Sequence, residues 1–235
     1  LLMNNNKLVS VILATYNSSE TISASLESIL NQTYKNIELL VVDDCSTDNT
    51  YEILDEYSKN YSQIRLFKNN ENVGLTKSLN FLINKSKGEF IARQDSDDTS
   101  DSDRIKKQLK FIYTYKLDGC TTRALKNGTL ITPRISYYLP TKVVIKYKNP
   151  FVHGTLLIRK STINKINNYD ERFYYSQDYK LFTDLLNAGY KISIMKEALY
   201  NLNTLNNISS KYKEEQKYYA DCVRKRKNPF QEIIK

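Results

Sequence analysis

The chain has 235 residues, of which 40% are hydrophobic, and a formal net charge of +9. A chain of this size can bury one sizeable core, so we expect one large domain, or one domain with an appendage. No apolar run approaches the ~18–20 residues of a membrane-spanning helix, and residues 1–7 lack the apolar centre of a signal peptide. Cys45, Cys120 and Cys222 lie far apart, which predicts reduced thiols in a cytoplasm rather than a disulfide framework.

The positive charge would suit nucleic acid, an anionic membrane surface or a phosphorylated ligand. Much of the excess lies late in the chain, where Lys and Arg alternate with tyrosines between residues 211 and 227. This stretch predicts a basic helical tail. Its outer face either lies against anionic lipid or is simply solvated, with the tyrosines packed beneath it. The chain has no RNA-binding signature, zinc spacing or helix-turn-helix pattern, so we expect no nucleic-acid partner.

The first hundred residues alternate between strand-like and helix-like segments. Short apolar runs of strand length are followed by segments whose apolar residues recur at helical spacing. We predict strands at 8–14, 37–42, 64–67 and 89–94, and helices at 20–30, 51–57 and 75–83. This alternation predicts the α/β class, with a mainly parallel, Rossmann-like sheet covered by helices on both faces. Ligands of such sheets bind beyond the carboxyl ends of the strands.

Three polar segments follow predicted strands, and parallel order would bring them to that same edge. They are Thr15-Tyr16-Asn17, Asp43-Asp44, and Asp95 to Asp98. Tyr16 offers an aromatic face for a base, and Asp44 can accept hydrogen bonds from a base or ribose. Alternatively, Thr15 and Asn17 only cap the next helix, and Asp44 only shapes a turn. Neither G-x-G-x-x-G nor G-x-x-x-x-G-K-[ST] occurs, which disfavours a dinucleotide oxidoreductase and a P-loop nucleotide hydrolase.

The acids at 95–98 follow directly on an apolar strand, where unpaired buried carboxylates are costly. Asp95 and Asp97, spaced as Asp-x-Asp, can share one Mg²⁺ or Mn²⁺ that keeps positions open for the oxygens of a diphosphate. On these residues alone, an equally good interpretation is a solvated turn before a helix near Arg104. Asp98 or Asp101 would then be the N-cap of that helix.

The second half of the sequence is harder to interpret. Residues 114–148 have no clear period because glycines and prolines interrupt it, so we expect a variable insertion or short strands under a substrate site. Order returns with a strand at 155–158 and a loop at 169–173. A helix then opens at residues 176–179 and ends near Gly189, a typical stop residue.

Six blocks of the sequence resemble the family-two inverting glycosyltransferases, which have the GT-A nucleotide-sugar fold. In order, they are VSVILATYN, VVDDCSTDNT, NVGLTKSLN, KGEFIARQDSDD, NPFVHGTLLIRKS and YDERFYYSQDYKLFTDLLNAGYKI. The resemblance runs from about Val9 to Asn203. IARQDSDD and GLTKSLN look most like the bacterial subgroup that builds exopolysaccharide, capsule, O-antigen or lipooligosaccharide.

The resemblance implies a nucleotide-diphosphate sugar donor, usually UDP-linked, a divalent metal (Mn²⁺ or Mg²⁺), and transfer with inversion at the anomeric carbon. We expect a glycan or lipid-linked acceptor and action at the cytoplasmic face of a membrane, where the basic tail would contact lipid. The expected organisation is a donor-binding half at 1–113, an acceptor-binding and catalytic half at 114–205, and a basic helical tail at 206–235.

The resemblance also implies roles for single residues. Tyr16 and Asp44 match positions that hold the nucleobase. Asp95 matches the acid that faces the ribose and the metal's waters, and Asp97 matches the metal ligand, while Asp98 supports the cluster or faces the sugar. Asp178 matches the general base. The family usually has Glu-Asp where this chain has Gln-Asp, and without the resemblance Asp178 would be interpreted as an N-cap or first-turn acid.

Further candidates for contact with the donor are Lys77, Asn80, Arg93 and His153, together with Thr15, Asn17 and Ser96 beside the matched positions. Lys77 and Arg93 face phosphate or acceptor, or bridge to the acids. His153 contacts diphosphate, orients the acceptor, or is a hydrogen-bonded core histidine. Many relatives have Arg where Leu79 stands, so that donor contact is not expected here.

Three other functions compete with transfer. One is a basic RNA-binding domain, which steep salt-dependent RNA affinity without sugar-nucleotide binding would support. A nucleotidyltransferase would need a glycine- and arginine-rich loop after the first strand, and residues 14–20 contain none. A non-catalytic nucleotide-sugar or carbohydrate-binding module is disfavoured because Asp95, Asp97 and Asp178 are all present.

Overall fold

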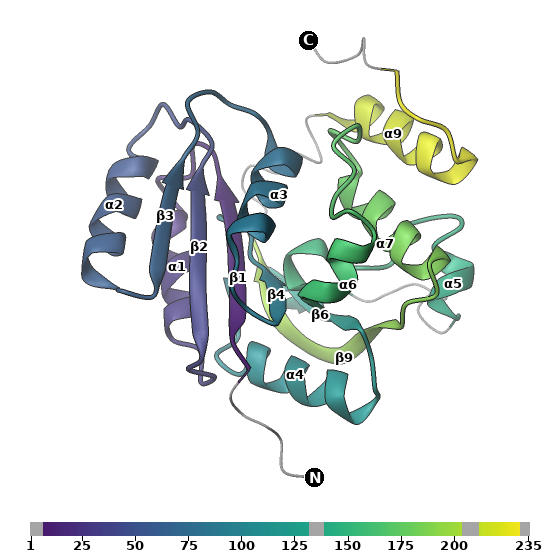
Figure 1. Cartoon of the computed structure of the whole chain (residues 1–235), viewed down its shortest axis with the longest axis horizontal. Coiled ribbons are helices and arrows are strands. Elements are labelled where there is room, and N and C mark those ends of the chain that lie inside the picture. Colours follow the sequence, from purple (N-terminus) through teal and green to yellow (C-terminus); the bar gives the residue numbers. More distant parts are fainter. Residues whose placement is uncertain (1–6, 132–138, 204–211, 231–235) are drawn as a thin grey trace.

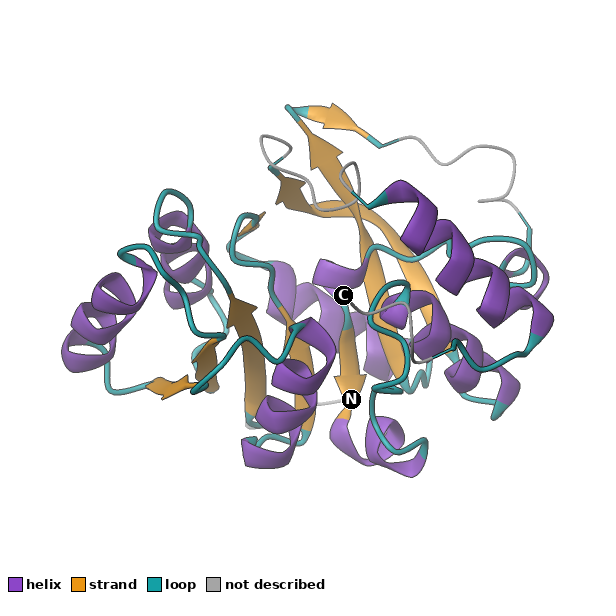
Figure 2. Cartoon of the chain, turned by 90° about the horizontal axis from the view of Figure 1, so that it is seen from above, coloured by secondary structure: helices purple, strands orange, loops and turns teal. Residues whose placement is uncertain are grey.

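The computed structural model describes residues 7–131, 139–203 and 212–230, and these form one mixed sheet with helices on both faces (Figures 1 and 2). The strand order is β3-β2-β1-β4-β8-β6-β9-β5, with β7 beside β6. The strands are β1 Val9–Thr15, β2 Ile37–Asp43, β3 Ile64–Lys68, β4 Phe90–Arg93, β5 Thr99–Ser100, β6 Gly119–Lys126, β7 Thr129–Leu130, β8 Leu157–Arg159 and β9 Ile192–Leu202.

The first four strands in the spatial order confirm the predicted α/β pattern. β1 pairs in parallel with both β2 and β4, and β2 pairs in parallel with β3. The side chains of β1 are buried on both faces, as expected for a strand covered by helices on either side. Parallel pairing requires crossover connections, which the intervening helices supply.

The other half of the sheet mixes directions. β8 runs antiparallel to β4 and β6, β9 runs parallel to β6, and β5 runs antiparallel to β9. The segment 114–148, expected as an insertion or short strands, contains the eight-residue strand β6. β9 was not predicted. Its register against β6 shifts twice, and its middle carries exposed Lys196 and Glu197, so it has no regular alternation of apolar and polar residues.

The helices divide between the two faces of the sheet (Figure 2). They are α1 Ile22–Leu30, α2 Thr50–Asn60, α3 Leu75–Lys85, α4 Arg104–Thr114, α5 Thr141–Val144, α6 Lys160–Lys165, α7 Gln177–Asn187 and α9 Lys213–Lys225, with a 3₁₀ turn η2 at His153–Thr155. One hydrophobic cluster joins the sheet to α1, α2 and α4. The other joins it to α3, α6, α7 and α9.

The late helices match the predictions in part. α7 ends close to Gly189, whose φ of +87° is the left-handed conformation that favours glycine after a helix. The predicted tail helix occurs as α9, and its Tyr219, Cys222 and Val223 are buried in the core. The rest of the predicted tail, 206–211 and 231–235, lies outside the described residues. Among the helices that are described, none is both long enough and apolar enough to cross a bilayer.

Candidate active site

The loops that follow β1, β2 and β4 meet at one edge of the sheet, as predicted. The Asp44 amide donates to the carbonyl of Thr15 (2.8 Å), and the Asn17 side-chain carbonyl accepts from the amide of Thr47 (2.8 Å). The hydroxyl oxygens of Ser18 and Ser96 lie 2.9 Å apart. Parallel strand order therefore brings segments some eighty residues apart in sequence into direct contact.

The two residues matched to nucleobase positions differ in surroundings. Tyr16 is 46% exposed and leaves its ring open to a ligand. Asp44 is buried, and its carboxylate accepts from Asn69 Nδ2 (2.7 Å), the Val73 amide (3.0 Å) and the Gly74 amide (2.8 Å). Gly74 has φ of +86°, a conformation that favours glycine. Asp44 therefore holds the loop that leads into α3.

Asp43 is a site residue to which sequence reasoning assigned no role. It lies directly opposite Thr15 in the β1–β2 register. Its Oδ2 accepts from the Ser46 amide (3.2 Å), but Asp43 Oδ1 and Thr15 Oγ1 are buried without a hydrogen-bond partner among the described residues. Unpartnered buried polar atoms are costly, and two of them side by side mark the end of this strand pair as a place for polar contacts.

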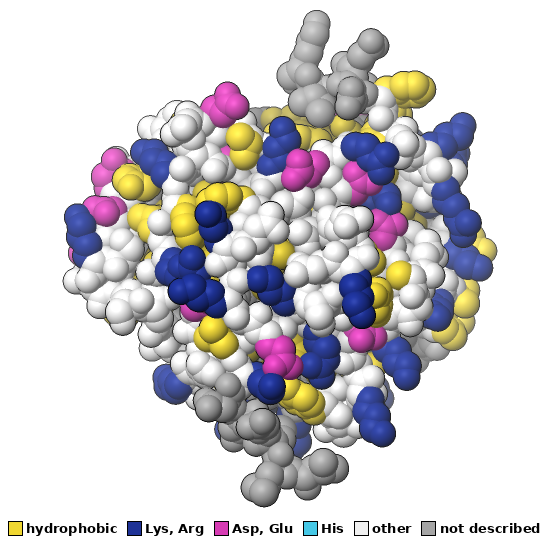
Figure 3. Space-filling view, in the orientation of Figure 1, with side chains coloured by type: hydrophobic (Ala, Val, Ile, Leu, Met, Phe, Trp, Pro, Cys, Tyr) yellow, Lys and Arg dark blue, Asp and Glu magenta, His cyan; other side chains and the backbone are white. Residues whose placement is uncertain are grey.

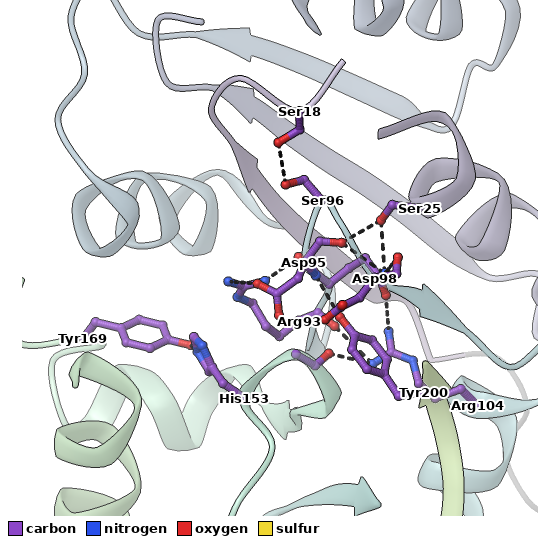
Figure 4. Close-up of polar contacts among 12 residues, drawn as sticks. Ser18, Ser25, Arg93, Asp95, Ser96, Asp98, Arg104, His153, Tyr169 and Tyr200 are labelled. Carbon is purple, nitrogen blue, oxygen red and sulfur yellow. Dashed lines mark hydrogen bonds and ion pairs between the residues drawn. The ribbon is translucent and has the colours of Figure 1, made fainter. Parts of the chain in front are cut away.

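The acids that follow β4 form a network around two buried arginines (Figure 4). Arg93, predicted to face phosphate or to bridge to the acids, is 1% exposed and pairs with Asp95 Oδ1 at 2.7 Å. Asp98 Oδ1 accepts from the Asn203 amide at 2.8 Å, and the Tyr200 hydroxyl accepts from the Asp95 amide at 3.0 Å. The N-cap of α4 is Asp103, so the alternative of Asp98 or Asp101 as that N-cap is wrong.

The acid cluster holds more negative charge than its neighbours balance. Burial, with the charge of Asp95, raises the pKa of Asp97, and no Lys or Arg of the described residues pairs with this carboxylate. Burial and the charges of Asp95 and Asp97 raise the pKa of Asp98 to about 8. Hard carboxylate oxygens with uncompensated charge fit a divalent cation. The described ranges contain no group of three or more His, Cys, Asp or Glu side chains that could hold an ion.

Asp98 gives a prediction for stability in the presence of chelator. Between the ordinary aspartate pKa near 4 and about 8, the folded protein keeps a proton that the unfolded chain releases. The free energy of unfolding should therefore fall as pH rises through this window, by up to about 1.4 kcal/mol per pH unit. Asp98→Asn should flatten the curve measured by urea unfolding. The exposed, charge-matched Asp101→Asn should keep the slope, and an unchanged slope in Asp98→Asn would contradict the assignment.

Two further residues of this network, Arg104 and Tyr200, were missed as site residues. Arg104 is fully buried and donates to the carbonyls of Arg93 and Gly154, both at 3.1 Å. Its guanidinium lies over the Tyr200 ring, 5.5 Å from the centroid. Arg104 thus ties the end of β4 to the turn η2. From the sequence, an arginine at the start of a helix would be expected on the surface. Only the folded structure shows that Arg104 is buried.

Gly154 belongs to the NPFVHG block and lies against the acid cluster. A Cβ atom on Gly154 would overlap with Asp95 Oδ2 and with the Tyr200 hydroxyl. Asp95 is held by Arg93 and Tyr200 is buried, so neither can move freely. Only glycine permits this approach.

Gly154→Ala should therefore displace the Asp95 carboxylate and weaken metal-dependent binding of a nucleotide sugar about tenfold, equivalent to roughly 1.4 kcal/mol. Isothermal calorimetry measures the change. Gly128→Ala is the control for an alanine placed away from the acids. No atom lies within 4 Å of the added carbon, and the strain that the φ of +73° imposes on alanine is local to the turn between β6 and β7, so donor affinity should not change. Equal affinities of Gly154→Ala and the parent protein would show that the close approach does not shape the site.

His153 lies beside the network and is hydrogen-bonded to Tyr169, with Nε2 2.7 Å from the tyrosine hydroxyl. Burial, reinforced by the charge of Arg93, lowers the pKa of His153 to about 3. The imidazole is therefore neutral near pH 7 and would meet a diphosphate as a hydrogen-bonding group rather than as a cation.

Asp178 lies in the first turn of α7, as predicted. Its Oδ2 accepts from Asn149 Nδ2 (2.8 Å) and its Oδ1 from the Tyr179 amide (2.7 Å). Burial raises the pKa of Asp178, and the charge of Asp95 raises it further. The N-cap of α7 is Ser176, so Asp178 is a first-turn acid held by Asn149. Its carboxylate retains lone pairs for a further donor.

Asn80 and Lys77, the remaining predicted donor contacts, differ in their surroundings. The side-chain amide of Asn80 is hydrogen-bonded to the loop after α6. It donates to the Tyr169 carbonyl and to Glu171 Oε1, both at 2.9 Å, and accepts from the Tyr169 amide at 3.0 Å. Asn80 therefore positions the residue that holds His153. Lys77 is exposed on α3.

Comparison with known proteins identifies the family of this chain. Residues 10–182 match the family described as "Glycosyl transferase family 2". The chain belongs to glycosyltransferase family 2. EpsE of Bacillus subtilis (strain 168) is 35% identical over 206 residues, covering 85% of this chain and 74% of EpsE. WfaP of Escherichia coli, named as a UDP-Glc:alpha-D-GlcNAc-diphosphoundecaprenol beta-1,3-glucosyltransferase, is 32% identical over 217 residues, covering 88% of this chain and 82% of WfaP.

Solved structures show that this family 2 chain has the GT-A fold expected from its sequence. Residues 1–349 of S. aureus TarS in complex with UDP-GlcNAc superpose with a TM-score of 0.74 at 22% identity, covering 87% of this chain and 61% of that one. The mannosyltransferase PcManGT of Pyrobaculum calidifontis, in complex with GDP-Man and Mn²⁺, superposes with a TM-score of 0.75 at 20% identity, covering 95% of this chain and 66% of that one. The chain thus spans less than two thirds of the length of either solved chain.

Proposed function

We propose that the protein transfers a hexose or N-acetylhexosamine from a nucleotide-diphosphate sugar to a hydroxyl group of a glycan or lipid-linked acceptor, with inversion at the anomeric carbon. The observation that carries the proposal is the under-neutralised acid cluster at the carboxyl edge of the parallel strands. This cluster occurs in a family 2 chain that also has Asp178, and the negative charge of Asp95 contributes to raising the pKa of that carboxyl group.

The donor would bind across the edge where β1, β2 and β4 end. Tyr16 would stack on the base, and the unpartnered oxygens of Asp43 and Thr15 would provide acceptors around the base and ribose. Asp44, whose carboxylate already accepts three hydrogen bonds, would offer the base a remaining lone pair. Asn17 and Ser96 would shape the loops around the donor through their contacts with Thr47 and Ser18. We propose a UDP-linked donor because WfaP, the relative named above, carries UDP-Glc in its name.

Asp97 and Asp95 would hold the divalent ion, which supplies positive charge to the diphosphate leaving group when bound. Mn²⁺ or Mg²⁺ suits these hard oxygen ligands. Arg93 fixes Asp95 through their ion pair, and Gly154 leaves room for that carboxylate. Lys77, exposed on α3, is available for a phosphate, and neutral His153 is available as a hydrogen-bonding partner for phosphate or acceptor.

Asp178 would act as the general base. The acceptor oxygen forms a bond to the anomeric carbon while the bond from that carbon to the diphosphate oxygen breaks, and the acceptor proton passes to the Asp178 carboxylate. Asn149 and the Tyr179 amide orient this carboxylate. Its raised pKa makes it a stronger base than a surface aspartate.

We place the reaction in the synthesis of a bacterial surface polysaccharide, at the cytoplasmic face of a membrane. Support comes from the names of relatives such as WfaP and the O-antigen biosynthesis glycosyltransferase WbnJ of Escherichia coli, which is 30% identical over 214 residues. A diphosphoundecaprenol-linked sugar is the acceptor class that WfaP's name suggests.

The test is a calorimetric titration with UDP-, GDP- and dTDP-sugars, each with Mn²⁺ and with chelator, followed by a transfer assay on diphosphate-lipid-linked sugars. We expect one UDP-sugar to bind only with metal and to be consumed in the presence of acceptor. Metal-dependent binding without transfer to any acceptor would instead support a non-catalytic binding module, and absence of binding across the panel would refute the proposal.

A further inference from the structure

One continuous stretch of sequence carries positive charge without any acidic residue. Residues 119–169 contain nine Lys or Arg residues and no Asp or Glu, a net charge of +9. The basic stretch at 211–227 differs, because its seven Lys or Arg residues are accompanied by three acids. The acid-free stretch includes α5 and its flanks, and it leads directly into the NPFVHG block.

The part of this stretch from 139 to 148, which we call the 139–148 surface, exposes apolar side chains. Leu139 is 48% exposed, Val143 44% and Tyr147 72%. Val143 in α5 and Tyr147 in the turn that follows it are four residues apart, a spacing that places them on the same side of the segment. Leu139 precedes the extended N-cap residue Pro140 and lies outside the helix. Val144 and Ile145 face the core instead and anchor the segment. The exposed apolar side chains are thus held outward by a fixed segment.

Lysines lie between these apolar side chains. Lys142, Lys146 and Lys148 are exposed, and no carboxylate of the described residues lies within ion-pair distance of any of them. Arg224 of α9 donates to the carbonyl of Tyr147 (3.4 Å), so the last turn of α9 adjoins this surface. Figure 3 shows Lys and Arg side chains along the right-hand edge of the molecule, over α9 and α5, with hydrophobic side chains among them.

We propose that the 139–148 surface docks the protein on an anionic lipid bilayer, an inference that rests on the proposed transfer to a membrane-borne acceptor. Exposed aliphatic and aromatic groups interleaved with unpaired lysines match the two forces that hold a protein at a membrane surface, apolar insertion and attraction to anionic headgroups. A second copy of this chain would bring two cationic surfaces together, which charge repulsion opposes. Nucleic acid would make no use of the exposed aliphatic side chains of Leu139 and Val143.

The proposed docking surface is joined to the catalytic machinery by short connections. Asn149, which follows Lys148 directly, donates to the Asp178 carboxylate, and the Tyr179 hydroxyl donates to the Ile145 carbonyl at 2.7 Å. Docking would therefore set the orientation of Asp178 relative to the bilayer. A sugar carried on a lipid would reach the base without leaving the membrane surface.

The test is flotation of the purified protein with vesicles of phosphatidylcholine containing about one third phosphatidylglycerol, compared with phosphatidylcholine alone. We expect binding to the anionic vesicles only, weakened by salt. The triple variant Lys142→Glu, Lys146→Glu, Lys148→Glu should lower partitioning about 100-fold, and Leu139→Ser, Val143→Ser, Tyr147→Ser should lower it at least about tenfold. Lys106→Glu, Lys110→Glu, Lys116→Glu, at exposed positions on and after α4, is the charge-matched control and should bind normally.

Three outcomes would overturn the proposal. The first is that the protein does not float with anionic vesicles. The second is that the lysine and the apolar triple variants of the 139–148 surface both float as well as the parent protein. The third is that binding is lost only when Lys225, Arg226 and Lys227 are changed to Glu. Monomer state is checked by ultracentrifugation, because self-association that the patch changes abolish would assign the surface to a second copy. Donor affinity is measured separately in solution, so failure of docking and failure of the proposed transfer are distinguishable.

Discussion

Asp178→Asn should reduce the rate of sugar transfer about 10²–10⁴-fold, the usual contribution of a positioned proton acceptor, while donor affinity stays within about twofold. The reason is geometric and electrostatic. Asn has nearly the same shape as Asp, but it cannot take the proton of the acceptor hydroxyl. The donor contacts proposed above do not involve Asp178. Single-turnover transfer and donor calorimetry separate the two quantities.

The pH dependence gives a second readout on the same residue. Because a base must be deprotonated and burial raises the pKa of Asp178, the transfer rate of the unaltered protein should fall as pH decreases through that raised pKa. This acid limb should disappear in Asp178→Asn. Asp184→Asn, on the same helix and paired with Lys180, should keep both rate and limb. An Asp178→Asn protein with normal transfer would remove the base assignment.

Asp97→Ala should abolish metal-dependent donor binding. Removing a residue that only hydrogen-bonds to a metal ligand typically lowers metal affinity ~10–100-fold. A carboxylate that binds the metal directly contributes more, so we expect at least a ~100-fold loss of donor affinity with Mn²⁺. In chelator the variant and the parent protein should give the same titration, without detectable donor binding, because the donor is expected to bind only with metal. Calorimetry with and without Mn²⁺ measures both values.

The matched control is Asp101→Ala, an exposed acid four residues later, just after β5. Folding of the Asp97 variant is checked by urea unfolding. The unfolding midpoint should not decrease, because removing a carboxylate with a raised pKa relieves repulsion within the cluster. Retained Mn²⁺-dependent binding in Asp97→Ala would place the ion elsewhere.

The order of strands and helices through β4 and the edge at which their loops meet could be predicted from the sequence. The physical reason is that buried parallel strands are continuous apolar runs, and their helices repeat apolar residues at 3.6-residue spacing. Both signals are local. The acids at 95–98, with Tyr16 and Asp44 after earlier strands, were placed together on this basis, and the contacts between Ser18 and Ser96 and between Asn17 and Thr47 confirm it.

Only the tertiary structure revealed β9, the burial of Arg104 and the close approach of Gly154 to Asp95. β9 is irregular because it pairs with β6 through two register shifts, and long-range pairing of this kind leaves no period in either strand. Arg104 and Tyr200 become site residues through contacts across the fold, which no local spacing encodes. The sequence by itself therefore determined the donor edge, where local patterns suffice, and tertiary packing decided how that edge is held and which surface adjoins Asp178.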